Sequence, residues 1–459
     1  MANTTISVSD FINTKYRDYW IYSNRNGKNS IEPREQLPEV VRKIIFASYK
    51  INIKERDEHK TTELMGEVGK YHAHGPSSIE DSIKGVATAY KSQKAVRLLE
   101  GVGNFGAAAG DEGAAGRYTS VSGTPLLTAA YRDIPFVPIS TDDTGLEQAE
   151  YISLPIPMVL VNGQSPIGTG KSCYVTERDA REICEWIRDM EHNNDWDIRN
   201  HPAPKPMSVT GCKTWYEPSN GYIYYEAVVH EKVNMNDLNK RGKYDVITAL
   251  PPKKTPDIVM NNLINKLPTR VSKQIVDGSG KGRPIWIVVP HGYLDKSDYM
   301  KYGMRTARKE SIYIWDENGA NGAGTMRSGD LVEIAKRWFD DRCGVVTKRL
   351  NKQLEDSKQV IHRIDLIKEF AEQHMIDWKS DDVIKHFANL FPETGEEDAA
   401  LVLGMSARSF LPESVGKNEI ARQKELDRQV EIQKLIDNIG DTVVDEAFDI
   451  IDKQEAFFD

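Results

Sequence analysis

The feature that most constrains this chain is a long stretch with almost no turn signals, from Asp330 to about Met375. Apolar residues recur through it with the spacing of one helix face, which predicts one or two long helices. A matching stretch, Glu413 to Ile439, follows a compact helical segment. Two long helices joined in this way can pair antiparallel, so the sequence predicts a coiled coil with a small knob at its tip.

The N-terminal part predicts several shorter helices. Glu39 to Tyr49 carries an amphipathic stripe typical of a helix. Glu63 to Tyr90 is typical of a helix, a glycine-containing turn and a second helix, which makes it a helix-turn-helix candidate. In the second helix we expect Ser77 to cap the first amides while Glu80 reaches back to the cap, as in a capping box.

The residues from Gly101 to Gly116 are almost all Gly, Ala, Asn and Asp, a composition that predicts a loop. This loop leads to Arg117 and Tyr118 and then to the strand-like sequence RYTSV. The middle, from about Pro155 to Met326, alternates strand-like runs such as YIYYEAVV and PIWIVVP with Gly, Pro and Asn-Gly turns. The expected fold class is therefore α+β.

Composition narrows the class of protein further. With 459 residues, of which 39% are hydrophobic, the chain is long enough for two or three globular domains. No apolar run is long enough to cross a bilayer and the first residues lack the pattern of a signal peptide, so we expect a cytoplasmic protein without a membrane association. The four cysteines are scattered and no histidines cluster, which predicts buried thiols and no metal site in this chain.

A formal net charge of −9 argues, taken alone, against a nucleic-acid-binding protein. The distribution of charge changes this expectation. Arg34 to Arg97 contains 12 Lys and Arg against 9 Asp and Glu, whereas Ile376 to the C-terminus contains 9 against 20. The acidic residues are concentrated in the last quarter, so the N-terminal third can contact phosphate.

Single motifs in this region are weak. GVGNFG fits the GxGxxG pattern of dinucleotide-binding proteins, but a charged amphipathic helix precedes it and more loop follows it, which argues against that fold. His72 and His74 lack nearby acidic or thiol partners, so a structural role in the turn or contact with phosphate is favoured over metal binding. Tyr118 by itself is one of 19 tyrosines.

The motifs in combination are far more specific. YHAHGPSSIEDSI, GVGNFG, GRYTSV and LPIPMVLVNGQSPIGTG occur in this order, followed by VITALPP, PIWIVVP, RWFDDRCGVVTKRL and ALVLGMSARSF. This series resembles the breakage-reunion domain of the type IIA topoisomerases: gyrase A, topoisomerase IV and, closest in architecture, the medium subunit of phage topoisomerases. The resemblance covers nearly the whole chain. If the source is a phage, the expected location is the host cytoplasm.

The resemblance implies a domain organisation. Residues 1–154 would form a winged-helix DNA-cleavage domain that contains the helix-turn-helix, and residues 155–329 an α+β tower domain. Residues 330–439 would form the coiled coil, with a dimerisation knob near Leu401 to Phe410, known as the C-gate. Residues 440–459 are expected to be an acidic tail.

The resemblance also implies roles for individual residues. Tyr118 would be the nucleophile that attacks a DNA phosphodiester, with Arg117 and His74 stabilising the charge of the transition state. Ile167 would intercalate between base pairs, and Ser77 and Asp81 would form the quinolone drug site. The residues expected to contact DNA are Arg42, Lys43, His72, Ser77, Asn104, Asn162 and Ile167.

This sequence departs from the family pattern in places. The family's Asp-Gly-Leu-Lys-Pro stretch is here REQLPEVVRK, so only Arg42 and Lys43 carry over cleanly. An upstream arginine that assists catalysis in the family corresponds to Arg25, Lys28 or Arg34, and the sequence does not choose among them. Pro166 stands in the intercalation loop where the family commonly has Gly.

The resemblance implies an ATP-dependent enzyme that breaks both DNA strands through 5′-phosphotyrosyl bonds, passes a second duplex and religates. Because no phosphate-binding ATP loop and no acidic metal cluster is visible, Mg²⁺ and ATP are expected to bind mainly to a TOPRIM/ATPase partner subunit. We expect a homodimer that acts on double-stranded DNA. The gyrase DNA-wrapping domain has no counterpart here, so relaxation and decatenation are expected rather than supercoiling.

Two alternatives to this function come from other classes of DNA-binding protein. A non-catalytic DNA clamp of the same fold would be expected if the Arg-Tyr pair had been lost, but Arg117 and Tyr118 are present. A tyrosine recombinase or type IB enzyme would need a tyrosine on a late helix with Arg and His-x-x-Arg partners. Here the tyrosine comes early, after a glycine-rich loop.

Overall fold

A computed structural model describes residues 6–25, 30–88, 96–106, 112–141, 145–165, 173–196, 201–205, 211–234, 242–280, 285–316 and 324–458. The chain divides into two compact units. The first contains residues 1–342 together with 443–459, and the second contains residues 343–442. We call the second unit the helical arm.

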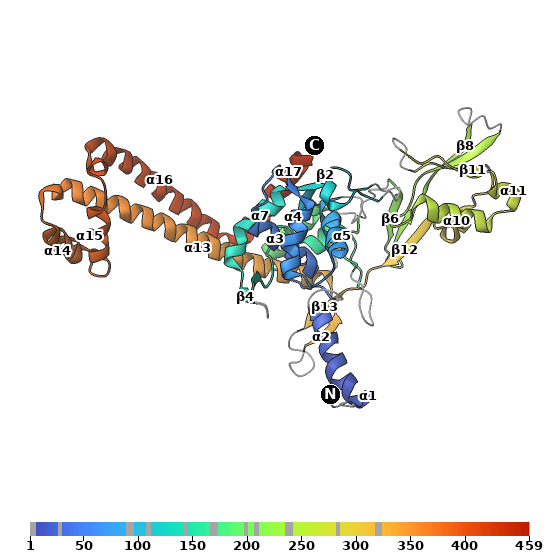
Figure 1. Cartoon of the computed structure of the whole chain (residues 1–459), viewed down its shortest axis with the longest axis horizontal. Coiled ribbons are helices and arrows are strands. Elements are labelled where there is room, and N and C mark those ends of the chain that lie inside the picture. Colours follow the sequence, from blue (N-terminus) through green and yellow to red (C-terminus); the bar gives the residue numbers. More distant parts are fainter. Residues whose placement is uncertain are drawn as a thin grey trace. The chain divides into compact units, whose positions relative to one another are not determined.

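The first unit begins with helices at its N-terminus and then forms a cluster that we call the head. The head consists of three helices and the three-stranded antiparallel sheet β1-β3-β2 (Figure 1). Helix α4 packs on both α3 and α5, and their apolar faces, including Ile44, Leu64 and Ile83, are fully buried. The bounds are α3 Glu39–Lys50, α4 Thr61–Tyr71, α5 Pro76–Ala87, β1 His59–Lys60, β2 Leu99–Val102 and β3 Ser120–Gly123.

The sequence predictions for the head are confirmed in outline. The helix expected at Glu39 to Tyr49 is α3, and α4, a turn and α5 form the expected helix-turn-helix. The prediction of a capping box at Ser77 and Glu80 was wrong. Helix α5 starts before Ser77, with Gly75 as its N-cap and Pro76 in its first turn, so Ser77 and Glu80 lie inside the helix.

The chain up to Asn193 contains further elements. They are α1 Val8–Phe11, the π-helical η1 Ile12–Tyr16, α2 Arg17–Arg25, the 3₁₀ turn η2 Gly116–Tyr118, α7 Pro125–Asp133, η3 Ile134–Phe136, β4 Ile139–Thr141, β5 Glu147–Ala149, α8 Met158–Asn162 and α9 Ala180–Asn193. The expected strand RYTSV is only partly a strand, because Gly116 to Tyr118 form η2 and β3 begins at Ser120.

The middle of the chain forms sheets in the order β10-β11-β9-β8, β12-β7-β6 and β13-β14. Helix α10 buries Val259 and Leu263 against Ile247 and Ile287 of the first of these sheets. The strands are β6 Lys213–Glu217, β7 Tyr222–Glu226, β8 Val228–Asn234, β9 Lys243–Ala249, β10 Val276–Asp277, β11 Ile287–Pro290, β12 Arg305–Lys309, β13 Tyr313–Asp316 and β14 Thr325–Ser328. The helices are α10 Pro256–Lys266, α11 Thr269–Ser272, η6 Lys296–Asp298 and α12 Tyr299–Tyr302.

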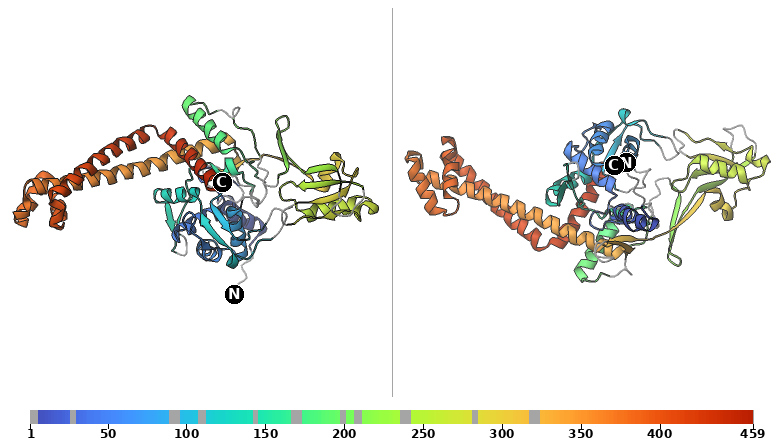
Figure 2. Two further views of the ribbon diagram at one scale, coloured as in Figure 1. Left: turned by 90° about the horizontal axis from the view of Figure 1, so that it is seen from above. Right: turned by 60° about the horizontal axis from the view of Figure 1, so that its bottom comes forward.

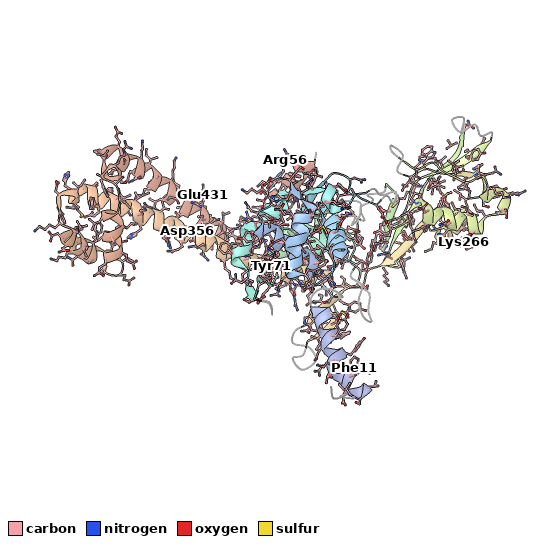
Figure 3. The ribbon with its side chains drawn as sticks, in the orientation of Figure 1. Phe11, Arg56, Tyr71, Lys266, Asp356 and Glu431 are labelled. Atoms are coloured by element: carbon pink, nitrogen blue, oxygen red, sulfur yellow. The ribbon has the colours of Figure 1, made fainter. Side chains whose placement is uncertain are left out.

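The helical arm is built on two long helices that run side by side (Figures 1 and 2). Helix α13, Leu331–Glu372, begins in the first unit and continues into the arm, and α16, Pro412–Asp437, returns along it. Ser357 Oγ donates to the Glu425 carbonyl at 3.3 Å, and Arg422 Nε lies 2.7 Å from Asp365 Oδ1, which fixes the antiparallel register. Figure 3 labels Asp356 on α13 and Glu431 on α16.

A small core closes the end of the arm where the chain turns back. It contains Phe370, Phe387 and Val402 among its buried side chains. The connecting elements are η8 Met375–Asp377, α14 Ser380–Leu390, α15 Gly395–Leu403 and η9 Ala407–Phe410. The two long helices and the compact helical connection are therefore as predicted.

The expected acidic tail was wrong. Residues Ile439–Phe458 form helix α17, which belongs to the first unit from Val443 onward. Between its acidic residues, Val443, Val444, Ala447, Ile450 and Ile451 are buried. This apolar stripe makes the segment part of the core of the first unit.

The mixture of helices and antiparallel sheets confirms the α+β class. Cys173, Cys184 and Cys212 are buried, as predicted, whereas Cys343 is partly exposed. Among the helices that the structure describes, none is both long enough and apolar enough to cross a membrane.

Candidate active site

The exposed tyrosine of the predicted site lies at the end of a rigid turn. Tyr118 is the last residue of η2, and its N–H donates to the Ala115 carbonyl at 2.8 Å. Tyr118 is 68% exposed, whereas Gly116 and Thr119 on either side are buried. We call Gly116 to Thr119 the tyrosine turn. It presents a phenol to solvent from a backbone that is hydrogen-bonded within the head.

Helix α4 holds the C-terminal side of the tyrosine turn. The Thr61 N–H donates to the Thr119 carbonyl at 3.1 Å, and the two threonine hydroxyls lie 2.8 Å apart. A Cβ atom on Gly116 would lie 2.9 Å from Met65 Sδ, so the turn packs against α4 and a larger residue there would require the Met65 side chain to shift.

Arg117 lies beside the nucleophile candidate. Its guanidinium carbon is 5.0 Å from the centre of the Tyr118 ring, and both side chains are exposed. A guanidinium at this distance can hydrogen-bond the non-bridging oxygens of a phosphate that the phenol contacts. The structure thus brings together the two residues on which the sequence prediction depends most.

The GVGNFG loop lies next to the tyrosine turn, because β2 and β3 pair with Val102 opposite Ser120. Gly103 has a φ of 103°, which favours glycine, and a Cβ there would lie 3.5 Å from the Tyr118 carbonyl oxygen. Asn104 is exposed, although its Oδ1 accepts from the Gly106 N–H at 2.9 Å. Asn104 therefore shares a surface with Tyr118.

His72 and His74 lie at the other end of α4. His72 is the C-cap of that helix and is 8% exposed, whereas His74 is exposed. Their rings contact each other edge to face, with centroids 4.4 Å apart. The described contacts of His74 are with His72, so the structure does not place it against Tyr118 within one chain.

Ser77 and Asp81 are exposed on the first half of α5. The N-terminus of this helix directs backbone N–H groups outward and favours an anion such as a DNA phosphate. Glu80 on the same helix accepts a hydrogen bond from the backbone N–H of Gly116 at 3.1 Å. Sequence reasoning missed this contact because it assigned Glu80 to a capping box.

The two basic residues expected to contact DNA on α3 are already engaged within the chain. Arg42 Nη1 lies 3.1 Å from Glu35 Oε2 and also donates to the Glu150 carbonyl. Lys43 Nζ lies 2.7 Å from Glu39 Oε1, and both side chains are about nine-tenths buried. Lys43 and Glu39 form an i,i+4 pair of α3, whereas sequence position alone does not reveal the Arg42 contact with the Glu150 carbonyl.

Asn162 has a structural role that the sequence did not predict. It is 5% exposed, its Oδ1 accepts from the Val96 N–H at 3.0 Å, and its Nδ2 donates to the Val96 carbonyl at 2.7 Å. Both ends of the amide are used in the interior, so this structure gives Asn162 a packing role and its contact with DNA stays a prediction. Ile167, the expected intercalating residue, and Pro166 lie outside the described residues.

Of the three candidates for the upstream catalytic cation, only Arg34 has a described side chain. Arg34 Nε lies 2.7 Å from Glu32 Oε1, and its guanidinium lies 4.5 Å from the centre of the Tyr151 ring. The side chain of Arg25 and the whole of Lys28 are outside the described residues. Within the part of the chain that is described, no three His, Cys, Asp or Glu side chains are grouped to hold a metal ion.

Comparison with known proteins agrees with the order of the motifs. A family model for the A subunit of DNA gyrase/topoisomerase IV matches residues 36–448. The chain is 29% identical over 294 residues to the DNA gyrase A protein of Buchnera aphidicola, which covers 60% of this chain and 34% of the relative. It is 25% identical over 399 residues to the DNA topoisomerase 4 A protein of Staphylococcus epidermidis, and this alignment covers 78% of this chain and 46% of the relative.

A longer alignment joins the chain to the DNA gyrase A protein of Leptospira biflexa, with 23% identity over 469 residues that cover 95% of this chain and 51% of the relative. The chain thus spans about a third to a half of the length of these curated relatives. Because the family model takes in most of the chain, including the tyrosine turn, the chain belongs to the family of DNA gyrase/topoisomerase IV A proteins.

Proposed function

We propose that this chain is the DNA breakage-reunion subunit of a type IIA topoisomerase and that Tyr118 is its nucleophile. The observation that carries the proposal is the tyrosine turn. It exposes one phenol beside one guanidinium while two helices and a sheet fix its backbone. A nucleophile in enzymatic group transfer needs this combination of access and fixed position.

The proposed chemistry is a reversible transesterification. Tyr118 Oη attacks the phosphorus of a DNA phosphodiester, a bond forms between the phenolic oxygen and phosphorus, and the bond to the 3′ oxygen breaks. The phenol proton leaves to solvent, and the 3′ oxygen takes up a proton to become a hydroxyl. The product is a 5′-phosphotyrosyl ester, which conserves the bond for religation by the reverse step.

Arg117 supports this step electrostatically. A free phenol has a pKa of about 10, so its ionised form needs a nearby cation at neutral pH. Arg117 supplies a permanent positive charge beside the ring, and its donors can contact the non-bridging oxygens as charge accumulates on them. His74 stays the proposed second donor to the transition state and Ser77 a proposed DNA contact, and both are exposed around the start of α5.

The described residues of this chain do not fit a catalytic metal ion, since no acidic cluster of the required kind is present among them. We propose that Mg²⁺ and ATP bind mainly to a TOPRIM/ATPase partner subunit. Strand passage driven by ATP, with relaxation or decatenation as its result, belongs to the assembled enzyme.

The architecture supports the domain roles proposed for each region. The head has three helices and a small antiparallel sheet, as expected of a winged-helix domain. We assign the sheets of the middle of the chain to the tower. The helical arm exposes apolar side chains at its closed end, including Leu390, Leu401 and Leu411, which suits a homodimer contact. We keep the predicted boundaries 1–154, 155–329 and 330–439 for these domains.

The test is a cleavage assay on supercoiled plasmid. The wild type, Tyr118→Phe and the control Tyr222→Phe are each mixed with the TOPRIM/ATPase subunit from the same source and Mg²⁺, and the reaction is stopped with denaturant. Tyr222 is also partly exposed but lies on β7 in the tower. Protein attached to 5′ ends in the wild type and Tyr222→Phe, but not in Tyr118→Phe, is the expected result.

The other outcomes separate the alternatives. Equal attachment in all three proteins would show that another residue is the nucleophile. Attachment at 3′ ends would indicate recombinase or type IB chemistry. DNA binding without attachment in any of them would favour a non-catalytic clamp.

A further inference from the structure

Glu80 connects the helix expected to contact DNA with the turn that carries the nucleophile. Its carboxylate oxygen Oε1 accepts the backbone N–H of Gly116 at 3.1 Å, two residues before Tyr118. No local pattern predicts this contact, because Glu80 and Gly116 are 36 positions apart. Glu80 lies one turn beyond Ser77 on α5, and its side chain is only partly exposed.

Lys84 holds the same carboxylate oxygen from the other side. Its Nζ lies 2.6 Å from Glu80 Oε1, one helical turn along α5. The Lys84 side chain is 8% exposed and that of Glu80 is 19% exposed, so the pair is shielded from water. A shielded, charge-assisted contact of this kind is stronger and better defined in position than an exposed one.

The two flanks of the tyrosine turn are thereby held by different helices. Helix α4 fixes Thr119 through Thr61 and packs Met65 against Gly116, while α5 fixes the N–H of Gly116 through Glu80. Among the described hydrogen bonds, the Glu80 contact is the one that can transmit a displacement of α5 to the tyrosine turn. A shift of the reacting oxygen of about 1 Å is enough to cost on the order of 100-fold in rate.

We propose that Glu80, held by Lys84, is a positioning residue that sets the placement of Tyr118 relative to the DNA-contacting face of α5. The proposal rests on the proposed function of Tyr118 as the nucleophile. Glu80 touches neither DNA nor the phenol, and its effect acts through the backbone of Gly116. Loss of the Glu80 carboxylate should therefore lower the rate of cleavage and leave the affinity for DNA unchanged.

The experiment compares Glu80→Ala, Glu80→Gln and Lys84→Met with the wild type, and uses Glu67→Ala as the matched control. Glu67 forms a similar helix ion pair, with Lys70 at 2.6 Å, but lies on α4 and has no contact with the tyrosine turn among the described hydrogen bonds. Glutamine keeps a side-chain oxygen that can accept the Gly116 N–H, whereas alanine does not. Each variant is assayed in the complete enzyme with its partner subunit.

Three quantities are measured. The first is the single-turnover rate of covalent complex formation on plasmid, the second is the Kd for a short DNA duplex, and the third is hydrogen exchange of the peptide that contains Gly116. We expect Glu80→Ala to form the complex about 10- to 100-fold more slowly, with the Kd changed by less than about twofold. Its Gly116 peptide exchanges faster, Glu80→Gln recovers most of both losses, and Glu67→Ala resembles the wild type.

Lys84→Met tests whether the ion pair is needed to hold the carboxylate. We expect it to slow complex formation less than Glu80→Ala does, because Glu80 can still accept the Gly116 N–H. A rate equal to that of the wild type would remove Lys84 from the proposal.

Specific results would overturn the role of Glu80. Unchanged exchange of the Gly116 peptide in Glu80→Ala means that the hydrogen bond does not hold the turn. A cleavage defect that glutamine does not rescue, or a Kd that weakens as much as the rate, assigns Glu80 a role in folding or DNA affinity instead. If the wild type forms no covalent complex while exchange still depends on Glu80, the contact stands and the proposed function is what fails.

Discussion

The head and the helical arm are both rich in helix, yet they are stabilised in different ways. Helix α3 in the head buries seven of its 12 residues, whereas α16 in the arm buries only Ile432 of its 26. The head is held by a packed core beneath the tyrosine turn. In the arm, α13 buries side chains such as Val345, Val346 and Leu350, whereas α16 contributes mainly polar contacts, and a small core lies at the end.

This difference matches what each region is proposed to do. A nucleophile must stay within a fraction of an ångström of its place, and a dense core provides that restraint. A helix with few buried residues, such as α16, opens more easily on its own, as elements that move during function generally do.

Removal of a buried charge in the first unit should cost the most stability. Arg342 is fully buried, its Nη1 lies 2.7 Å from Asp133 Oδ2, and its Nη2 donates to Glu446 at 2.9 Å. Asp133→Ala leaves a buried guanidinium without one of its two carboxylates, so we expect a loss of about 3–5 kcal/mol in the free energy of unfolding. Denaturation followed by circular dichroism measures this. A loss below about 1 kcal/mol would show that the first unit depends little on this network.

Truncation of an apolar side chain to alanine should cost more stability in the head than in the arm. Leu64 on α4 is fully buried, and Leu64→Ala should destabilise the protein by about 2–5 kcal/mol. Val430 on α16 is 56% exposed, and Val430→Ala should change stability by less than about 0.5 kcal/mol. Thermal melts of both variants give the comparison directly. Similar losses would contradict the difference in packing.

The stability of the first unit should also depend on pH through Glu35. Burial raises the pKa of Glu35 to about 8, and this effect outweighs the opposing influence of Arg42. The folded carboxyl therefore holds its proton more tightly than the unfolded one, whose ordinary pKa is 4.5. The stabilisation that comes from the protonated Glu35 carboxyl is fully present at low pH. The free energy of unfolding therefore falls as pH rises from about 4.5 to about 8, by at most about 1.4 kcal/mol per pH unit.

Glu35→Gln is the matched variant, because its neutral amide resembles the protonated carboxyl. Chemical denaturation of both proteins across this pH range measures the effect. The difference in stability between wild type and variant should change with pH in the stated direction. Parallel curves would mean that Glu35 ionises in the folded protein as easily as in the unfolded chain.

A small effect is also expected from an ion pair in the arm. Arg422 and Asp365 form an ion pair at 2.7 Å, but the two side chains are 31% and 40% exposed. Arg422→Ala should therefore cost only about 0.2–1 kcal/mol. Hydrogen exchange of peptides from α16 should rise slightly, while peptides from α3 should not change. A loss as large as that of Asp133→Ala would remove the distinction between the two regions.

Much of the fold was accessible from the sequence because helix periodicity and turn residues are local signals. The spacing of apolar residues in Glu39 to Tyr49 and in Asp330 to Met375 predicted α3 and α13. The glycine-rich loop before Tyr118 predicted an exposed position, and the residue is 68% exposed. The order of the motifs predicted the family, which the comparison confirms.

Other features depend on neighbours that are distant in sequence. Lone polar residues such as Asn162 and Arg42 could not be assigned, because Val96 and Glu150, which they contact, come near only in the folded chain. The composition of the last residues suggested an acidic tail. The prediction failed because an acidic segment with an apolar stripe becomes a core helix when the folded chain provides a surface that receives the stripe.

Local sequence was enough to predict where most helices and strands form, which tyrosine follows the glycine-rich loop, and the family to which the chain belongs. How that tyrosine is held was decided only when the chain folded. The tyrosine turn depends on Thr61 and Glu80, which contact it across 58 and 36 positions. A hydrogen bond at this separation leaves no local pattern, because it forms only when packing of the apolar faces has brought the two segments together.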